Sequence, residues 1–174
     1  MLAGLLLLAA LPQEAPAASA DPLAPARAGK IRCVSPNAAN RTCQTIIRYT
    51  VRDDGGFDAT VIGIVSRDPM VLLEYKSFGR IEEGGVCMMI RMHDFETGTL
   101  LYNGAPVGPS EGQRLRLQLQ GAVQPIAGKK RCFRDQPGNG DDMLSVITLD
   151  GVAQPEMQQR VAWLSPEEGY AVGL

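Results

Sequence analysis

Histidine is nearly absent from this sequence, and this restricts the chemistry that the chain can perform. His93 is the one histidine, so a Ser–His–Asp or Cys–His mechanism would have to use it. The four cysteines include no C-x-x-C pair, and this spacing with a single histidine does not suit a zinc site. No catalytic or cofactor motif rises above chance, and we expect neither a cofactor nor a bound metal.

An excess of either charge is also missing. The chain has 17 Lys and Arg residues against 19 Asp and Glu residues, so it has no general attraction to nucleic acid or to an anionic membrane. A local basic cluster at residues 129–134 holds four Lys or Arg side chains but only one aromatic residue on which a base could stack. We therefore expect no nucleic-acid partner.

Long apolar stretches are confined to the N-terminus. Residues 2–11 are almost all Leu and Ala, and a small-residue stretch that ends in Ala18-Ser19-Ala20 follows. About ten apolar residues are too few to span a bilayer but match the h-region of a signal peptide, and Ala18-x-Ala20 fits a cleavage site. No Lys or Arg precedes Leu11, so the positive n-region would come from the amino group or from an earlier start. We predict a signal peptide over residues 1–20, a periplasmic or secreted protein, and no membrane insertion after cleavage.

The remaining chain is long enough for one domain. Residues 21–30 are rich in Pro and Ala and are expected to form an extended tether. Residues 31–174 then form a single domain, since about 140 residues build one hydrophobic core but do not comfortably divide into two.

The four cysteines form an even set, which in an oxidising compartment indicates disulfides. Three pairings are open, and we favour Cys33–Cys43 with Cys87–Cys132. The first bridge closes a short polar loop with turn-forming residues. The second ties a predicted strand to the segment after the predicted helix, and each bridge is worth about 2–4 kcal/mol.

Alternating apolar and polar residues predict a series of antiparallel strands. Residues 45–52 and 57–66 alternate on either side of Asp53-Asp54-Gly55-Gly56, which is a strong hairpin signal. Further strands are expected over 71–78 and 86–92, which continue the meander, and over 143–149, which forms a C-terminal hairpin turning at Asp150-Gly151. Pro155 restricts the return arm of that hairpin to a sheet edge or a bulge, and residues 160–164 could resume the pairing.

Residues 110–127 fit two patterns. Residues 114–120 alternate as a strand would, but only the helical spacing continues past Gly121. We predict a helix here, and the sum is an α+β fold: an antiparallel sheet of about five or six strands, packed by one long helix and stabilised by disulfides.

Three segments are candidates for chemistry. His93 with Asp94 or Glu96 could form the acid–base part of a small exported hydrolase, although a histidine at a strand end is more often a surface residue. The segment 88–93 contains Met and His, but Met88 and Met92 would lie roughly 13 Å apart along a strand, which favours core packing over metal binding. Residues 135–142 look like a calcium loop but put Pro137 at a ligand position, which favours an exposed acidic loop.

The sequence does not name a ligand. We expect a small, exported, non-catalytic binding or interaction module of the bacterial cell envelope, which uses a sheet face or the helix–sheet groove to hold an unknown protein or small-molecule partner. The alternative is the hydrolase that uses His93 with Asp94 or Glu96.

Overall fold

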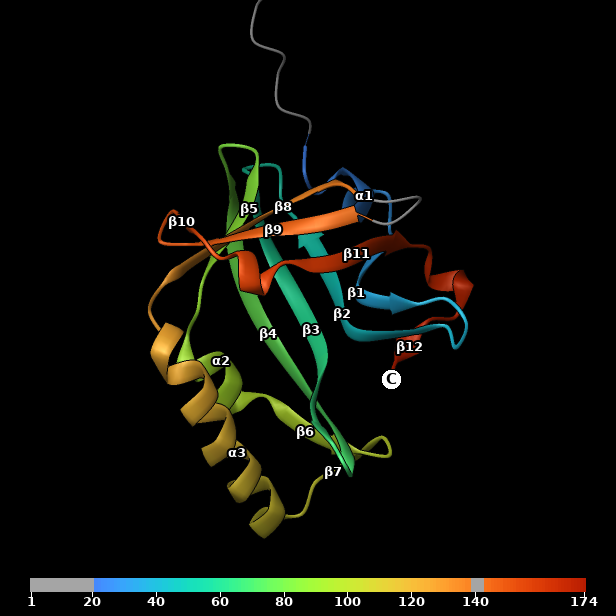
Figure 1. Cartoon of the computed structure of the whole chain (residues 1–174), viewed down its shortest axis with the longest axis vertical. Coiled ribbons are helices and arrows are strands. Elements are labelled where there is room, and N and C mark those ends of the chain that lie inside the picture. Colours follow the sequence, from blue (N-terminus) through green and yellow to red (C-terminus); the bar gives the residue numbers. More distant parts are fainter. Residues whose placement is uncertain (1–20, 139–142) are drawn as a thin grey trace, which may run out of the picture.

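The structure is a computed structural model that describes residues 21–138 and 143–174. Eight strands form a closed antiparallel barrel in the order β1-β2-β3-β4-β5-β8-β9-β11, and β11 pairs back to β1 (Figure 1). The barrel strands are β1 (Ile31–Asn37), β2 (Thr42–Val51), β3 (Gly56–Arg67), β4 (Met70–Glu82), β5 (Gly85–Met89), β8 (Lys130–Pro137), β9 (Met143–Leu149) and β11 (Gln159–Leu164).

Shorter elements are attached to the outside and the two ends of this ring. Four strands extend it: β6 (Thr99–Tyr102) beside β4, β7 (Ala105–Pro106) beside β6, β10 (Val152–Ala153) beside β9, and β12 (Ala171–Val172) beside β2. The helices of the described residues are α1 (Ala24–Arg27), α2 (Met92–Thr97) and α3 (Pro109–Val123), with 3-10 turns η1 (Gln124–Ile126), η2 (Pro155–Met157) and η3 (Pro166–Glu168).

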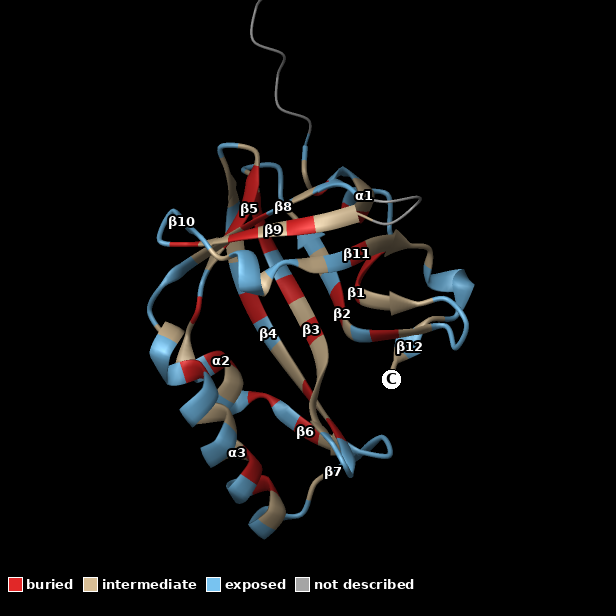
Figure 2. Cartoon of the chain, viewed as in Figure 1, coloured by how far each residue is buried: buried red, intermediate tan, exposed pale blue. Residues whose placement is uncertain are grey.

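The predicted α+β class is wrong, because the sheet closes on itself and the core lies inside it. The two strands that the sequence analysis missed are β1 and β8, and without them the ring has a gap. Every barrel strand contributes an apolar side chain to one interior cluster, so the long helix is not needed to cover a sheet face. Figure 2 shows α3 largely exposed or half-buried beside one end of the barrel.

The structure contains most of the strands and the helix that the sequence predicts. The hairpin turning at residues 53–56 joins β2 to β3, and the meander continues through β4 to β5 with antiparallel pairing throughout. The predicted helix is α3, and η1 continues it to Ile126. The strand predicted over 143–149 is β9, whose return arm is the two-residue β10.

One end of the barrel, here called the α1 end, is closed by residues expected to form a tether. Residues 21–30 include the single helical turn α1, and Leu23 from this segment is completely buried in the interior cluster with Ala26. Arg27 fixes the turn by donating to the carbonyl oxygen of Arg52 at 3.1 Å. Because Phe57 is also fully buried in this cluster, the α1 end of the barrel is filled.

The structure contains the two disulfides that the sequence favoured. Cys33–Cys43 joins β1 to β2, and Cys87–Cys132 joins directly opposed residues of β5 and β8. Two disulfides are typical of proteins in an oxidising extracellular or periplasmic environment. Within the described residues, no helix is both long enough and apolar enough to cross a membrane.

Candidate ligand cavity inside the barrel

The basic cluster of the sequence is divided between the two faces of β8. Because residues alternate along a strand, Arg131, Phe133 and Asp135 share one face, and Phe133 belongs to the interior cluster. Lys130 and Arg134 point to the other face, where they donate to the Glu82 carboxylate at 2.9 Å and to the Glu83 carbonyl oxygen at 2.8 Å. The inner face of β8 therefore carries a cation, a ring and an anion in succession.

Arg32 of β1 bonds to Asp135 across the interior of the barrel, although β1 is not a neighbour of β8 in the sheet. Its Nε and Nη2 donate to the two carboxylate oxygens of Asp135 at 3.0 and 2.8 Å, and Nη2 also donates to Ser145 Oγ at 2.7 Å. The guanidinium carbon lies 4.2 Å from the centre of the Phe133 ring, a cation–π contact.

This ion pair is almost completely enclosed, with side-chain exposures of 2% for Arg32 and 7% for Asp135. Burial alone lowers the pKa of Arg32, but its hydrogen bonds to Asp135 and its electrostatic interactions with Tyr49 and Asp135 raise the pKa above its ordinary value.

Arg131 lacks such a partner. Its Nε is buried without a hydrogen bond, and none of its side-chain atoms forms a hydrogen bond or an ion pair with residues 21–138 or 143–174. In the sheet it lies between Met88 and Leu149, which provide no polar group. Burial, together with the positive charge of Arg32, lowers the pKa of Arg131.

Tyr49 adds a second unsatisfied polar group to the interior. Its hydroxyl is buried without a partner among the described residues, and its ring packs edge-on against Phe57 with the centroids 5.4 Å apart. Burial raises the pKa of Tyr49 to about 12, although the nearby Arg32 and Arg131 act to lower it. Tyr49 is therefore a neutral hydroxyl at physiological pH.

A cavity of about 230 Å³ occupies the other end of the barrel, here called the α3 end. Both arginines line it, and Phe95 of α2 and Leu119 of α3 contribute to its wall. The other lining residues are mostly apolar: Val34, Thr45, Ile47, Val61, Gly63, Ile64, Val65, Leu73, Tyr75, Met88, Phe133 and Gln159. A largely apolar wall with a few convergent polar groups is typical of small-molecule sites.

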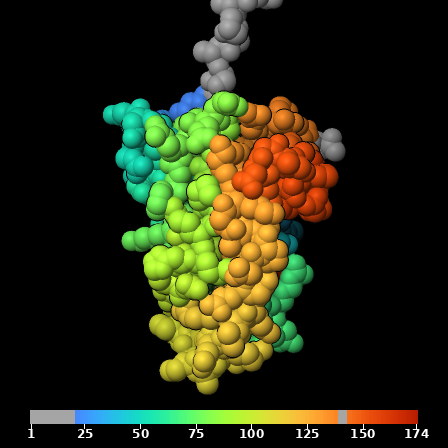
Figure 3. Space-filling model, turned by 90° about the vertical axis from the view of Figure 1, so that its left-hand side faces the viewer, coloured from blue at the N-terminus to red at the C-terminus, as the bar shows by residue number. Residues whose placement is uncertain are grey.

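Helix α3 is fixed beside this end of the barrel by Arg116. The guanidinium donates to the carbonyl oxygen of Glu96 in the last turn of α2 at 2.6 Å and to that of Gly98, which follows the helix, at 2.8 Å. Gln120 adds a hydrogen bond to the Glu96 carboxylate at 3.0 Å. Figure 3 shows α3 in gold along this face of the molecule, beside the yellow-green segment that contains α2.

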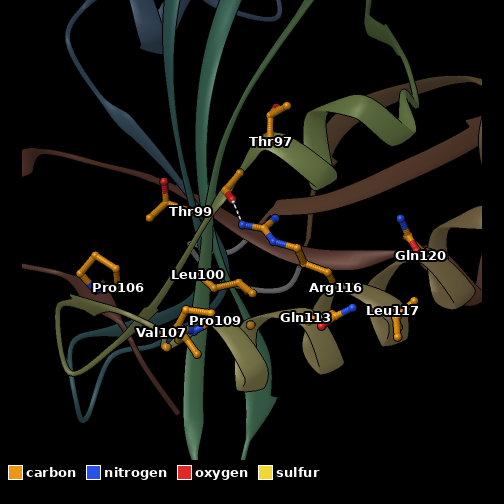
Figure 4. Close-up of a pocket in the computed structure, with 13 residues that line it drawn as sticks. Thr97, Thr99, Leu100, Pro106, Val107, Pro109, Gln113, Arg116, Leu117 and Gln120 are labelled. Carbon is orange, nitrogen blue, oxygen red and sulfur yellow. Dashed lines mark hydrogen bonds between the residues drawn. The ribbon is translucent and has the colours of Figure 1, made fainter.

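A larger groove of about 570 Å³ lies on the outer side of α3, between the helix and the β6–β7 hairpin (Figure 4). Arg116 is its cation, and this side chain already donates to backbone carbonyls, one of which is marked by the dashed line. Leu117, on the exposed side of the helix, is 62% accessible. The groove therefore offers volume but no charged group free to recognise a ligand.

The residues predicted for a hydrolase are close in the chain but differ in their contacts. His93 is exposed on α2, whereas Asp94 is buried and paired with Arg91 at 2.9 Å. Glu96 is exposed and accepts its hydrogen bond from Gln120. In the described part of the chain, no hydrogen bond joins His93 to either carboxylate, and hydrolase activity remains an untested prediction.

A serine with the spacing of a nucleophile motif also occurs, in the sequence Gly108-Pro109-Ser110-Glu111-Gly112. In hydrolases this motif forms a strained turn between a central strand and a helix. Here Ser110 is exposed in the first turn of α3, which follows the two-residue edge strand β7, and its φ is not positive. Ser110 therefore has the sequence spacing of the motif but not the strained strand-to-helix turn that exposes a nucleophile.

The two other candidate segments have structural roles. Met88 lines the cavity, whereas Met92 packs in a separate cluster near Val123. Asp135, expected in an exposed acidic loop, is instead the buried partner of Arg32, while residues 139–142 of that loop lie outside the described residues. No group of three His, Cys, Asp or Glu side chains that could hold a metal was found among residues 21–138 and 143–174.

Sequence reasoning missed both cavity arginines. The sequence carries no strand signal at Arg131, because residues 129–134 are mostly basic and do not alternate between apolar and polar side chains. Arg32 lay beside Cys33 in a segment that was assigned to a disulfide loop. Comparisons of the chain with protein-family models, with curated proteins and with solved structures found no match.

Proposed function

We propose that this chain is an exported, non-catalytic binding protein that holds a small molecule inside its barrel. The proposal moves the expected binding site from a sheet face or groove to the interior. Export, to the periplasm or the extracellular space, is supported by the signal-peptide pattern of residues 1–20 and by the two disulfides.

The cavity at the α3 end carries the proposal. Protein interiors are close-packed, whereas side chains leave a space of about 230 Å³ between the inner faces of the strands at this end. Eight-stranded barrels have an interior that side chains fill or that accommodates one small ligand. Because the same barrel is filled at its α1 end, we attribute the space at the α3 end to a ligand.

The volume limits the size of that ligand. Each non-hydrogen atom needs a space comparable to that of a water molecule in the liquid, about 30 Å³, so 230 Å³ holds about eight atoms. The apolar wall requires that most of these atoms be carbon. Benzamide and benzoate, with nine non-hydrogen atoms each, are suitable probes.

Two variants of α3 test the location. Leu119→Trp fills the cavity from the helix, whereas Leu117→Trp places the same side chain on the exposed side of the helix. Binding of benzamide or benzoate is measured by saturation-transfer NMR. We expect at least one of them to bind the wild-type protein, Leu119→Trp to abolish the signal, and Leu117→Trp to retain it.

Two results would contradict the proposal. One is the absence of binding by both probes to the folded wild-type protein. The other is binding that survives Leu119→Trp and is lost in Leu117→Trp, because this would place the ligand in the outer groove of α3. Circular dichroism of each variant establishes that the barrel is intact.

A further inference from the structure

The polar groups around the cavity do not balance in charge. Two guanidinium groups line it, from Arg32 and Arg131. Asp135 is the only carboxylate, among residues 21–138 and 143–174, that bonds to either of them. Two positive charges against one negative charge leave the site one positive charge in excess.

Asp135 is not available to share between the two arginines. Both of its oxygens accept from Arg32, in the bidentate geometry that suits a guanidinium and a carboxylate. Ser145 supports the same guanidinium from β9. The excess charge therefore belongs to Arg131.

Arg131 is half-buried, and its Nε is enclosed without a partner. The partial loss of water around its charge is therefore not repaid by an interaction with the protein. Arg131 lies between Met88 and Leu149 in the sheet, and both neighbours are apolar. Arg131 is thus a cation that lines the cavity and has a place for an anion beside it.

We propose that Arg131 binds the anionic group of the ligand and that the ligand is a small monocarboxylic acid with an apolar body. This inference rests on the proposed function. A single negative charge neutralises the excess, and the planar fork of a guanidinium matches a planar carboxylate.

The wall of the cavity suits the rest of such a molecule. The rings of Tyr75 and Phe95 lie 4.8 Å apart by their centroids, and both line the cavity. Leu119 and Val65 continue the apolar wall toward α3 and β3. A carboxylate at Arg131 can therefore have its apolar body against these side chains.

The matched pair benzoate and benzamide tests the charge. The two molecules have the same shape and number of non-hydrogen atoms, but only benzoate is an anion at pH 7. A hydrogen-bonded ion pair with Arg131 predicts that benzoate binds about 10- to 100-fold more tightly than benzamide, as measured by NMR titration.

Substitutions on β8 assign that preference to one side chain. Arg131→Met is expected to remove the 10- to 100-fold preference for benzoate while benzamide binds within about threefold of wild type. Arg131→Lys keeps the charge without the fork, and we expect an intermediate preference. Arg134→Met, on the outer face of the same strand, is the matched control and should keep the full preference.

The outcomes separate this inference from the proposed function. Equal affinity for benzoate and benzamide, or a benzoate preference that survives Arg131→Met, would overturn the inference while the cavity remains a binding site. Failure of both compounds to bind the wild-type protein would overturn the two together. If Arg131→Met does not fold, the preference for benzoate over benzamide is compared between Arg131→Lys and Arg134→Met. An equal preference in these two variants would overturn the inference.

Discussion

The two ends of the barrel are built from the same eight strands but are filled in different ways. At the α1 end, Leu23 from the N-terminal segment is fully buried with Phe57 in one packed cluster. At the α3 end, side chains of the strands and of two helices line a space of about 230 Å³. The packed α1 end shows that side chains can fill the interior of this barrel. We therefore attribute the unfilled space at the α3 end to function.

The two interior arginines differ in the same way. Arg32 has a bidentate carboxylate, a hydroxyl and an aromatic ring as neighbours. Arg131 has no polar partner within the described residues. Both arginines line the cavity, but the barrel supplies a partner for Arg32 and none, within the described residues, for Arg131.

The largest effect should follow from breaking the structural pair. Asp135→Ala leaves the guanidinium of Arg32 buried and unpaired, so the free energy of unfolding should fall by about 3–5 kcal/mol. Urea denaturation followed by circular dichroism measures this. The exposed pair of Arg52 and Asp58 is the control, and Asp58→Ala should cost about 1 kcal/mol or less. Similar losses in both variants would show that burial does not distinguish the pairs.

A second pair of substitutions compares the two ends directly. Leu23→Ala removes a completely buried side chain from packed surroundings, and we expect a loss of about 2–5 kcal/mol in the free energy of unfolding. Leu119→Ala enlarges a space that already exists, so its loss should be nearer to 1 kcal/mol. A small effect of Leu23→Ala in urea denaturation would mean that residues 21–30 do not stabilise the barrel.

The buried hydroxyl of Tyr49 predicts a loss of stability at alkaline pH. Burial raises the pKa of Tyr49 to about 12 from 10.0. The unfolded chain therefore releases this proton first, and stability falls as the pH rises from about 10 toward 12, by up to about 2–3 kcal/mol.

Tyr49→Phe should lose less stability than the wild type between pH 8 and pH 11 in urea denaturation. Tyr102→Phe removes an exposed hydroxyl and is the matched control. An identical pH dependence in wild type and Tyr49→Phe would contradict the burial of a neutral phenol in the barrel.

Local patterns predicted much of the secondary structure but not the closure of the sheet. The hairpin of β2 and β3 was predictable because both its strands alternate cleanly on either side of a Gly-rich turn. The strands β1 and β8 were not, since the pattern of Arg32 and Cys33 in β1, and of the basic residues in β8, indicated a loop and a surface cluster. Closure depends on pairing between strands far apart in the sequence, such as β1 with β11, and no local pattern specifies that pairing.

The cavity was hidden for a related reason. An arginine in a sequence indicates solvent exposure, because a buried charge needs a partner. The partner of Arg32 is 103 residues away, at Asp135, and only the fold brings them together. Arg131 has no partner to find, so its position inside the barrel emerges only from the register of β8.

The smallest change that we predict in the free energy of unfolding is a gain, and it concerns the difference between the two arginines. Arg131→Met keeps a long side chain but removes the charge and the unsatisfied Nε, so the free energy of unfolding without ligand should rise by about 1 kcal/mol. Arg134→Met, on the outer face of β8, should change stability by less than about 0.5 kcal/mol. Urea denaturation of both variants measures the difference. A loss of stability in Arg131→Met would mean that this guanidinium is structural, like that of Arg32. A gain would mean that the protein retains a destabilising charge. Such a trade-off between stability and function is expected of a residue kept for binding.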